Sequence, residues 1–243
     1  MTAAPTPPAA PEGAAGVFGP HLALAEAFVA VLADTGVTHG LIGPREVDRL
    51  WDRHVLNCAV IAGAFPQEAR LIDVGSGAGL PGLALAIARP DLDVHLVEPM
   101  LRRTNWLSET VAQLGLANVE VHRGRAEELA GRLDAPWVTA RAVARLEKLA
   151  RWCVPLLRDH GTLVAMKGRS VPEELATDRP ALQHLGLTSA RVTEHGVGVL
   201  AEPVLTVDLV FDRSAARGGG KGRRTGSSRR SEGEGSARGR TGA

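Results

Sequence analysis

The chain has 243 residues, 44% of them hydrophobic, which is enough for one α/β domain with flexible ends and too few for two full-sized domains. We find no apolar run near the roughly 20 residues that a membrane span requires, and no secretory signal pattern at the N-terminus. Cys58 and Cys153 are isolated and lack metal-ligand spacing, so we expect two reduced thiols, no metal site and a cytoplasmic location.

The net charge of +1 conceals an asymmetry along the chain. Residues 213–243 carry nine Lys/Arg and two Glu, a net charge of +7, which leaves −6 for the other 212 residues. Residues 1–16 are rich in Pro and Ala, and residues 213–243 contain no apolar side chain larger than Ala. We therefore expect both ends to be disordered, with a basic tail that adds non-specific RNA contacts, around a folded domain at residues 17–212.

Helical and extended segments alternate between these ends. Residues 17–66 are expected to form a helical extension, with one helix at 21–33 and another from Pro44 to residue 65. The core at residues 67–212 has strand-like runs separated by helical stretches, and the predicted strands are residues 70–75, 93–99, 118–124, 137–143, 161–168, 189–197 and 203–211. This alternation predicts an α/β fold with a mostly parallel sheet that is covered on both faces.

The strongest local signal is residues 71–82, Leu-Ile-Asp-Val-Gly-Ser-Gly-Ala-Gly-Leu-Pro-Gly, in which a buried strand runs into a glycine-rich turn and a helix. Gly75, Gly77 and Gly79 allow the turn and the close approach of a ligand to the backbone. The helix that follows presents an N-terminus that favours a negative group. A phosphate-binding P-loop is excluded because this loop has neither Lys nor Arg.

Two cofactors remain for this loop. Gly77, Gly79 and Gly82 meet the GxGxxG pattern of dinucleotide-binding oxidoreductases, with Glu98 placed to bind a ribose hydroxyl. The acidic Asp73 before the first glycine gives instead Asp-x-Gly-x-Gly-x-Gly, which resembles the loop of methyltransferases that use S-adenosyl-L-methionine. That cofactor brings a methionine carboxylate and ammonium and no pyrophosphate, and Glu98 is then its ribose-binding acid. We favour S-adenosylmethionine.

The list of possible methyl acceptors is shortened by the catalytic residues and motifs that the sequence lacks. Methylation of a pyrimidine C5 needs a cysteine nucleophile near the fourth or sixth strand, where neither Cys58 nor Cys153 lies. The Asn/Asp-Pro-Pro-aromatic turn used for exocyclic amines is missing after the fourth predicted strand. Guanine N7 has no proton to lose, so positioning can supply most of the rate. Other acceptors stay open at this point.

Several motifs in order resemble one family, the ribosomal RNA small-subunit methyltransferase G proteins, also called glucose-inhibited division protein B. The motifs are Leu-Trp-Asp-Arg-His-Val-Leu-Asn at 50–57, the loop at 72–82, Arg-Ala-Glu-Glu at 125–128, Thr-Ala-Arg-Ala-Val at 139–143 and Ala-Met-Lys-Gly at 165–168. The resemblance covers roughly residues 41–171. It implies a Rossmann-like class I S-adenosylmethionine-dependent methyltransferase fold, and methylation of guanine N7 in the 16S ribosomal RNA near the decoding site, with the 30S subunit as the setting.

The resemblance also implies roles for single residues. The cofactor-binding set joins the glycine loop to positions after the other strands: Asp73, Gly75, Gly77, Gly79, Leu80, Glu98, Ala126, Glu127 and Arg141. Arg141, Lys167 and His54 are the candidate catalytic residues, with Arg141 facing both the cofactor and the base. His54 shares a helix face with Leu50 and Asn57, so a satisfied, partly buried histidine is its alternative reading.

Three rival functions remain open from the sequence. One is a methyltransferase of another acceptor, and one is an NAD-dependent oxidoreductase that uses the same glycines. The third is a non-enzymatic RNA-binding protein whose basic tail makes the contacts.

Overall fold

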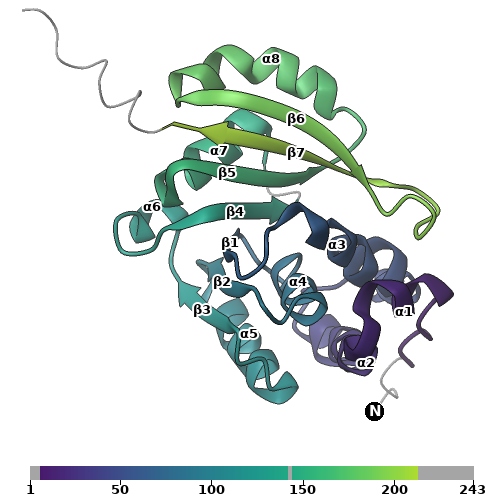
Figure 1. Ribbon diagram of the computed structural model, residues 1–243. Helices are drawn as coiled ribbons and strands as arrows, with labels where there is room; N and C mark the ends of the chain where they lie inside the picture. Colours follow the sequence, from purple (N-terminus) through teal and green to yellow (C-terminus); the bar gives the residue numbers. More distant parts are fainter. Residues whose placement is uncertain (1–5, 142–143, 213–243) are drawn as a thin grey trace, which may run out of the picture.

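One mixed sheet runs through the molecule (Figure 1). The computed structural model describes residues 6–141 and 144–212. Seven strands form the sheet: β1 (Arg70–Val74), β2 (Asp93–Glu98), β3 (Val119–Arg123), β4 (Ala135–Arg141), β5 (Leu157–Lys167), β6 (Leu187–His195) and β7 (Val204–Phe211). Their order across the sheet is β3-β2-β1-β4-β5-β7-β6. All seven strands overlap the predicted ranges; β5 begins four residues earlier than predicted, and residues 142–143 of the predicted fourth strand lie outside the described residues.

The pairing of the strands confirms the predicted α/β, Rossmann-like arrangement. β1 pairs in parallel with both β2 and β4, and β2–β3 and β4–β5 are parallel as well. β7 runs antiparallel to β5 and to β6, so the sheet ends in the expected hairpin. The strand order reverses between β1 and β4, and in such sheets ligands bind at the carboxyl ends of the strands beside this point.

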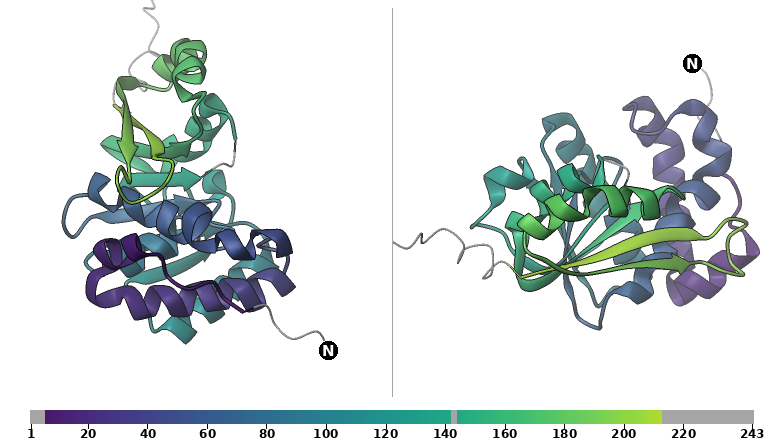
Figure 2. Two further views of the ribbon diagram at one scale, coloured as in Figure 1. Left: turned by 90° about the vertical axis from the view of Figure 1, so that its right-hand side faces the viewer. Right: turned by 90° about the horizontal axis from the view of Figure 1, so that it is seen from above.

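Helices cover both faces of the sheet (Figures 1 and 2). The α-helices are α1 (Glu12–Phe18), α2 (Leu22–Val31), α3 (Leu56–Ala59), α4 (Gly82–Ala88), α5 (Leu101–Leu114), α6 (Ala126–Leu129), α7 (Leu146–Cys153) and α8 (Val171–His184). The first five pack with Leu71 and Leu96 on one face, which we call the N-terminal face. α6, α7 and α8 pack with Ile72 and Val97 on the other, which we call the C-terminal face. Neighbouring residues of a strand therefore serve different cores.

The prediction of disorder over residues 1–16 is wrong for residues 6–16. Helix α1 begins at Glu12, and Ala14 and Phe18 are buried. The Phe18 ring lies edge-on to Trp51, 6.1 Å between centroids, and the Trp51 indole N–H donates to the carbonyl of Pro8 at 3.0 Å. These tertiary contacts order a segment whose composition predicts disorder. The remaining calls on the ends, residues 1–5 and the basic tail at 213–243, lie outside the described residues.

The helical stretch Glu12–Gly36 is long and apolar enough to cross a membrane, with a mean hydropathy of 1.6, which corrects the expectation that no such run exists. In this fold its apolar side chains have protein partners. Phe28 and Leu32 are fully buried in the core of the N-terminal face. At its end, Thr35 accepts a hydrogen bond from the indole of Trp106 on α5 at 2.9 Å. The large apolar side chains Phe28 and Leu32 therefore pack in the protein core, while 33% of the most apolar window of this segment is buried.

The second predicted helix, from Pro44 to residue 65, has the right extent and an irregular geometry. It consists of a 3₁₀ turn (Pro44–Arg49), a π-helical segment (Leu50–Val55), α3, and another 3₁₀ turn (Val60–Ala64). Three further short segments flank other helices: Gly19–His21 and Val154–Leu156 are 3₁₀ turns, and Leu32–Gly36 is π-helical. Irregular helical turns re-aim side chains that a regular helix would place elsewhere.

Candidate active site

The glycine loop connects β1 to α4 and holds the helix tightly against the sheet. The backbone N–H groups of Gly75 and Ser76 both donate to the carbonyl of Val97, at 2.9 and 3.2 Å, which ties the loop to β2. A Cβ atom built on Gly82 would lie 2.3 Å from the Leu96 side chain and 2.8 Å from the Asp73 carboxylate. Only glycine allows α4 to begin this close to the strands.

Asp73 lies beneath the loop at the end of β1 and is fully buried. Its Oδ2 accepts a hydrogen bond from the Gly82 N–H at 3.0 Å. Its Oδ1 has no hydrogen-bond partner among the described residues, although it is buried. Burial raises the pKa of this carboxyl from its usual 3.8 to about 7, against the opposing effect of the Gly82 hydrogen bond. An unpaired buried acceptor of this kind fits a donor supplied by a ligand.

Glu98, at the end of β2, is oriented by the backbone around it. Its Oε2 accepts from the Gly77 N–H at 3.1 Å, and its Oε1 accepts from the Met100 N–H at 3.0 Å. The side chain is only 3% exposed, and Arg103 lies 3.8 Å from Oε2. A carboxylate has about four lone-pair positions, so each oxygen keeps capacity for a ligand hydroxyl. Asp73, Gly77 and Glu98 thus meet at one edge of the sheet, as predicted.

A largely apolar hollow adjoins the loop on the C-terminal face. Its walls come from the ends of β1 and β2, from the start of α6 and from α7: Val74, Gly75, Val97, Pro99, Gly124, Arg125, Ala126, Glu127 and Trp152. Ala126 and Glu127, which the resemblance assigns to the adenine end of the cofactor, both line this hollow. Trp152 was missed as a site residue, because its sequence spacing indicates only a helix face and not that α7 lies beside α6. Leu80 is buried in the loop but does not line this hollow.

On the N-terminal face, the irregular helix brings two side chains, Cys58 and His54, to Arg141 at the end of β4. Arg141 Nη1 donates to the Cys58 thiol at 3.0 Å, and Nη2 donates to His54 Nδ1 at 2.9 Å. Because Nδ1 accepts, the ring proton sits on Nε2, which lies 3.2 Å from the Glu46 carboxylate. The structure thus joins His54 and Arg141, which the motifs indicate separately, and adds Glu46 and Cys58 to them.

The surroundings keep the partners of Arg141 uncharged. Burial lowers the pKa of His54, and the nearby Arg141 cation lowers it further. Burial also raises the pKa of the Cys58 thiol. A neutral imidazole and a neutral thiol can both accept hydrogen bonds from the Arg141 guanidinium, and neither places a second charge beside it. Glu46 was not predicted as a site residue from the sequence, although it stands only eight residues before His54. The π-helical segment brings these two side chains together.

Lys167 is placed apart from this group. Arg141 lies on the N-terminal face, whereas Lys167 points toward α7 and α8. Its Nζ donates to the Ala144 carbonyl at 2.8 Å and to Glu174 at 2.9 Å. The same Glu174 oxygen accepts from the Leu146 N–H at 2.5 Å, at the start of α7. The contacts of Lys167 are therefore those of an ion pair between elements, and Glu174 is a partner that the sequence did not indicate.

Comparison with known proteins decides which family this arrangement represents. The family profile of GidB, rRNA small subunit methyltransferase G, matches residues 21–199. The chain belongs to the GidB family. A ribosomal RNA small subunit methyltransferase G of Streptomyces avermitilis is 51% identical over 208 residues, covering 85% of this chain and 87% of that protein. A protein of the same name from Mycolicibacterium smegmatis is 48% identical over 227 residues, covering 91% and 95%.

The fold agrees with that of the S-adenosylmethionine-dependent methyltransferase SibL in its apo form, with a TM-score of 0.51 and 18% sequence identity, over 69% of this chain and 59% of that chain. The structure of M. jannaschii TYW2 in complex with AdoMet matches with a TM-score of 0.52 and 17% sequence identity, over 66% of this chain and 76% of that chain. At this identity the likeness concerns the fold alone, and it confirms the predicted class I methyltransferase fold. Membership of the GidB family makes the chain an enzyme of the methyltransferase class, so the oxidoreductase and non-enzymatic alternatives are excluded.

Proposed function

We propose that this chain transfers the methyl group of S-adenosyl-L-methionine to N7 of one guanine in 16S ribosomal RNA, in the loop near the decoding site. The observation that carries the proposal is the position of Arg141. In a member of the GidB family, it stands at the carboxyl end of β4 and is held by His54 at 2.9 Å and by Cys58 at 3.0 Å.

The residues of the loop fit the proposed cofactor. The unpaired Oδ1 of Asp73 suits the ammonium of a methionine moiety, which is a strong hydrogen-bond donor. Glu98 would accept from the ribose hydroxyls, and the apolar hollow lined by Ala126 and Trp152 suits an aromatic ring. When bound, S-adenosylmethionine supplies a methyl group on a positively charged sulfur, ready for displacement.

The side chains around Arg141 suit an acceptor that needs no base. Guanine N7 offers a lone pair directly, so alignment supplies most of the rate. His54 has both ring nitrogens engaged, by Arg141 and by Glu46, and is held neutral. Arg141 uses two of its five N–H donors on His54 and Cys58, which leaves three to orient the base or the cofactor. Its role is positioning and electrostatic.

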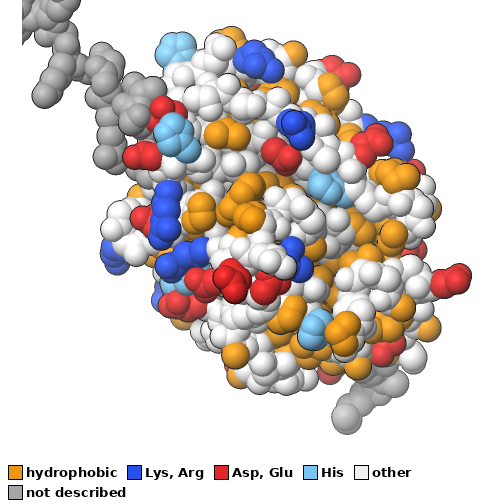
Figure 3. All heavy atoms as spheres, viewed as in Figure 1, with side chains coloured by type: hydrophobic (Ala, Val, Ile, Leu, Met, Phe, Trp, Pro, Cys, Tyr) orange, Lys and Arg blue, Asp and Glu red, His pale blue; other side chains and the backbone are white. Residues whose placement is uncertain are grey.

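The proposed partner is 16S ribosomal RNA within the 30S subunit, and the proposed location is the cytoplasm, where these subunits assemble. Acidic and basic side chains are interspersed on the face of the molecule shown in Figure 3. The net charge of +7 in residues 213–243 would therefore supply much of the non-specific attraction to phosphates. Lys167 is retained as a proposed catalytic residue only through the family motif, since its contacts are structural.

The test uses labelled S-adenosylmethionine and small subunits from cells that lack this gene. We expect label at one guanine of the decoding-site loop, mapped by the backbone cleavage that N7-methylguanine permits. Arg141→Ala should bind the cofactor and lose transfer by about 100-fold, because a preorganised donor is removed. Arg151→Ala, which removes an exposed guanidinium paired with Glu147, is the matched control and should keep full activity.

Either of two results would overturn the proposal. Label at a different RNA atom or in a protein would move the activity to another acceptor. Full transfer by Arg141→Ala would remove this arginine from the mechanism.

A further inference from the structure

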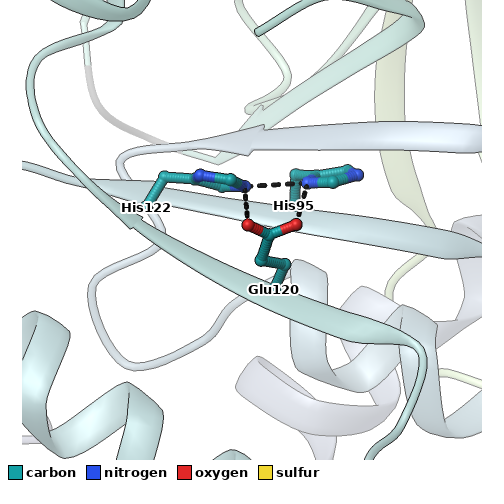
Figure 4. Close-up of side chains that lie close together, drawn as sticks. All are labelled: His95, Glu120 and His122. Atoms are coloured by element: carbon teal, nitrogen blue, oxygen red, sulfur yellow. Dashed lines mark hydrogen bonds and ion pairs between the residues drawn. The ribbon is translucent and has the colours of Figure 1, made fainter.

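A second group of chemically active side chains lies on the neighbouring strands β2 and β3, outside the glycine loop (Figure 4). His95 stands opposite Glu120 in the strand register, and His122 stands two residues further along β3 on the same face. His95 Nδ1 and His122 Nε2 are 2.8 Å apart. Glu120 Oε2 lies 3.5 Å from His95 Nδ1, and Glu120 Oε1 lies 3.7 Å from His122 Nε2. One potential ligand atom from each of the three residues thus lies within 4.8 Å of the other two.

We propose that His95, Glu120 and His122 form a binding site for Zn²⁺, with a water molecule as the fourth ligand. Two imidazoles and one carboxylate are a ligand set typical of zinc sites that keep one open position. Mg²⁺ and Ca²⁺ are a poor match because they prefer six or more oxygen ligands. No other group of three His, Cys, Asp or Glu side chains within residues 6–141 and 144–212 meets this spacing.

The distances suit a tetrahedral ion. Bonds of about 2.0–2.1 Å at tetrahedral angles place ligand atoms roughly 3.3–3.4 Å apart. The separations from Glu120 are 3.5 Å for Oε2 to His95 and 3.7 Å for Oε1 to His122, so a slight turn of the carboxylate would present one oxygen to the ion, and the separation between the imidazole nitrogens is 2.8 Å. Entry of the ion requires the two rings to part by about half an ångström. Rotation of one side chain supplies such a movement, because β3 is an edge strand.

The second ring nitrogen of His95 contacts a carboxylate, which is the usual arrangement for a histidine that binds a metal through its other nitrogen. Its Nε2 lies 3.2 Å from the Asp93 carboxylate, which favours the tautomer with the proton on Nε2. The lone pair of Nδ1 then points at the proposed site. Arg70 approaches the same carboxylate to 3.6 Å, and the two carboxylates of Asp93 and Glu120 outweigh this single positive charge. The site is therefore oriented and negative before an ion arrives.

Without the ion, His122 Nε2 must donate to His95 Nδ1, because the latter carries no proton. Coordination replaces this hydrogen bond. His122 then carries its proton on Nδ1 and turns the Nε2 lone pair to the metal, and no proton is lost from the neutral rings.

The three proposed ligand side chains differ in their exposure to solvent. The side chain of His95 is 3% exposed, that of His122 is 20% exposed, and that of Glu120 is 64% exposed. A buried anchor with an exposed carboxylate gives the ion an entry path. Gly124, two residues beyond His122, lines the hollow beside α6, so an ion here would hold the edge strand next to the proposed adenine site.

The test is a zinc titration of the full chain without an affinity tag, after treatment with EDTA and dialysis, followed by calorimetry at pH 7.5. We expect one zinc ion per chain. His122→Gln and Glu120→Gln should each weaken binding at least tenfold, and Asp93→Asn about 10- to 100-fold by releasing the His95 ring. The matched control is His184→Gln, a histidine of α8 that bonds the Pro180 carbonyl, and its affinity should stay unchanged.

Circular dichroism checks that each variant is folded. If His122→Gln does not fold, the exposed Glu120→Gln decides the point. Failure of the wild-type chain to bind zinc, or equal binding by Glu120→Gln, would overturn the site and leave the His95–His122 pair as a hydrogen bond alone. Residues 213–243 contain neither His nor Cys, which limits binding by the tail. The outcome is independent of methyl transfer.

Discussion

Asp73 shows how a single residue serves both the fold and the proposed cofactor site. Its carboxylate receives the first N–H of α4, at Gly82, and this bond joins the helix to β1. Its other oxygen is buried without a partner among the described residues, which is costly in the protein alone. That cost is consistent with a position kept for a ligand, and it makes the ionisation of Asp73 measurable.

The raised pKa of Asp73 predicts a pH-dependent stability. In the unfolded chain the carboxyl ionises near 3.8, whereas in the folded protein without ligand it ionises near 7. Between these values the folded state holds a proton that the unfolded state has lost, so this group makes the free energy of unfolding fall as pH rises. Its contribution is fully present below about pH 4 and is lost as pH rises through about 7.

Urea unfolding of the wild type and of Asp73→Asn from pH 5 to 8 measures this effect. The variant keeps an acceptor for Gly82 and cannot ionise. We expect its stability relative to the wild type to increase with pH up to about 7, by at most about 1.4 kcal/mol per pH unit. Parallel stability curves for the two proteins would contradict the prediction.

At the scale of elements, the geometry of the candidate active site depends on two close contacts between helical segments and the sheet. α4 rests on β1 and β2 through Gly82, and the irregular helix at residues 44–64 reaches across to the end of β4. The π-helical segment Leu50–Val55 contains His54, and this segment aims the imidazole at Arg141. A regular helix of the same length would present a different face, so the irregularity belongs to the site.

Gly82→Ala tests the first of these contacts. The added methyl group would meet Leu96 at 2.3 Å and Asp73 at 2.8 Å, so we expect a loss of about 1–3 kcal/mol in the free energy of unfolding. The matched control is Gly16→Ala in α1, where a Cβ atom has no neighbour within 4 Å among the described residues. That change should stabilise by about 0.4–1 kcal/mol. Urea midpoints that move in the same direction for both variants would contradict this interpretation.

At the scale of the whole molecule, the site residues and the excess of basic charge occupy different parts of the chain. The residues before 213 carry a net charge of −6, and the basic excess of +7 lies after them. The described site residues all lie within residues 46–174. We therefore predict that the proposed RNA attraction of residues 213–243 and the proposed methyl transfer are separable.

Removal of residues 213–243 should weaken binding to ribosomal RNA and make the affinity less dependent on salt, because fewer counterions are released. The turnover of bound substrate should change little. The measurement is the RNA affinity at several salt concentrations, together with KM and kcat. A chain of full length with its nine tail Lys/Arg replaced by Ser separates charge from length. An unchanged salt dependence in both variants would show that the tail makes no contact with RNA.

The sequence by itself determined the features that are written in one continuous segment. Apolar runs separated by helical stretches located all seven strands, because parallel strands that are buried on both faces read as nearly continuous hydrophobic segments. The glycine loop with Asp73, and Glu98 at the next strand end, were also readable, because a strand, a turn and a helix are local in the chain. The motifs additionally indicated His54 and Arg141, but not that they touch.

Only the tertiary structure decided which distant side chains meet. Arg141 contacts His54 across 87 positions, while Lys167 turns to the opposite face of the sheet and pairs with Glu174. Alternation along a strand shows that successive residues face opposite sides, but the helices that cover each side are set by packing. The ordering of residues 6–16 and the convergence of His95 with His122 have the same origin. Both depend on contacts between segments whose local patterns carry no information about each other.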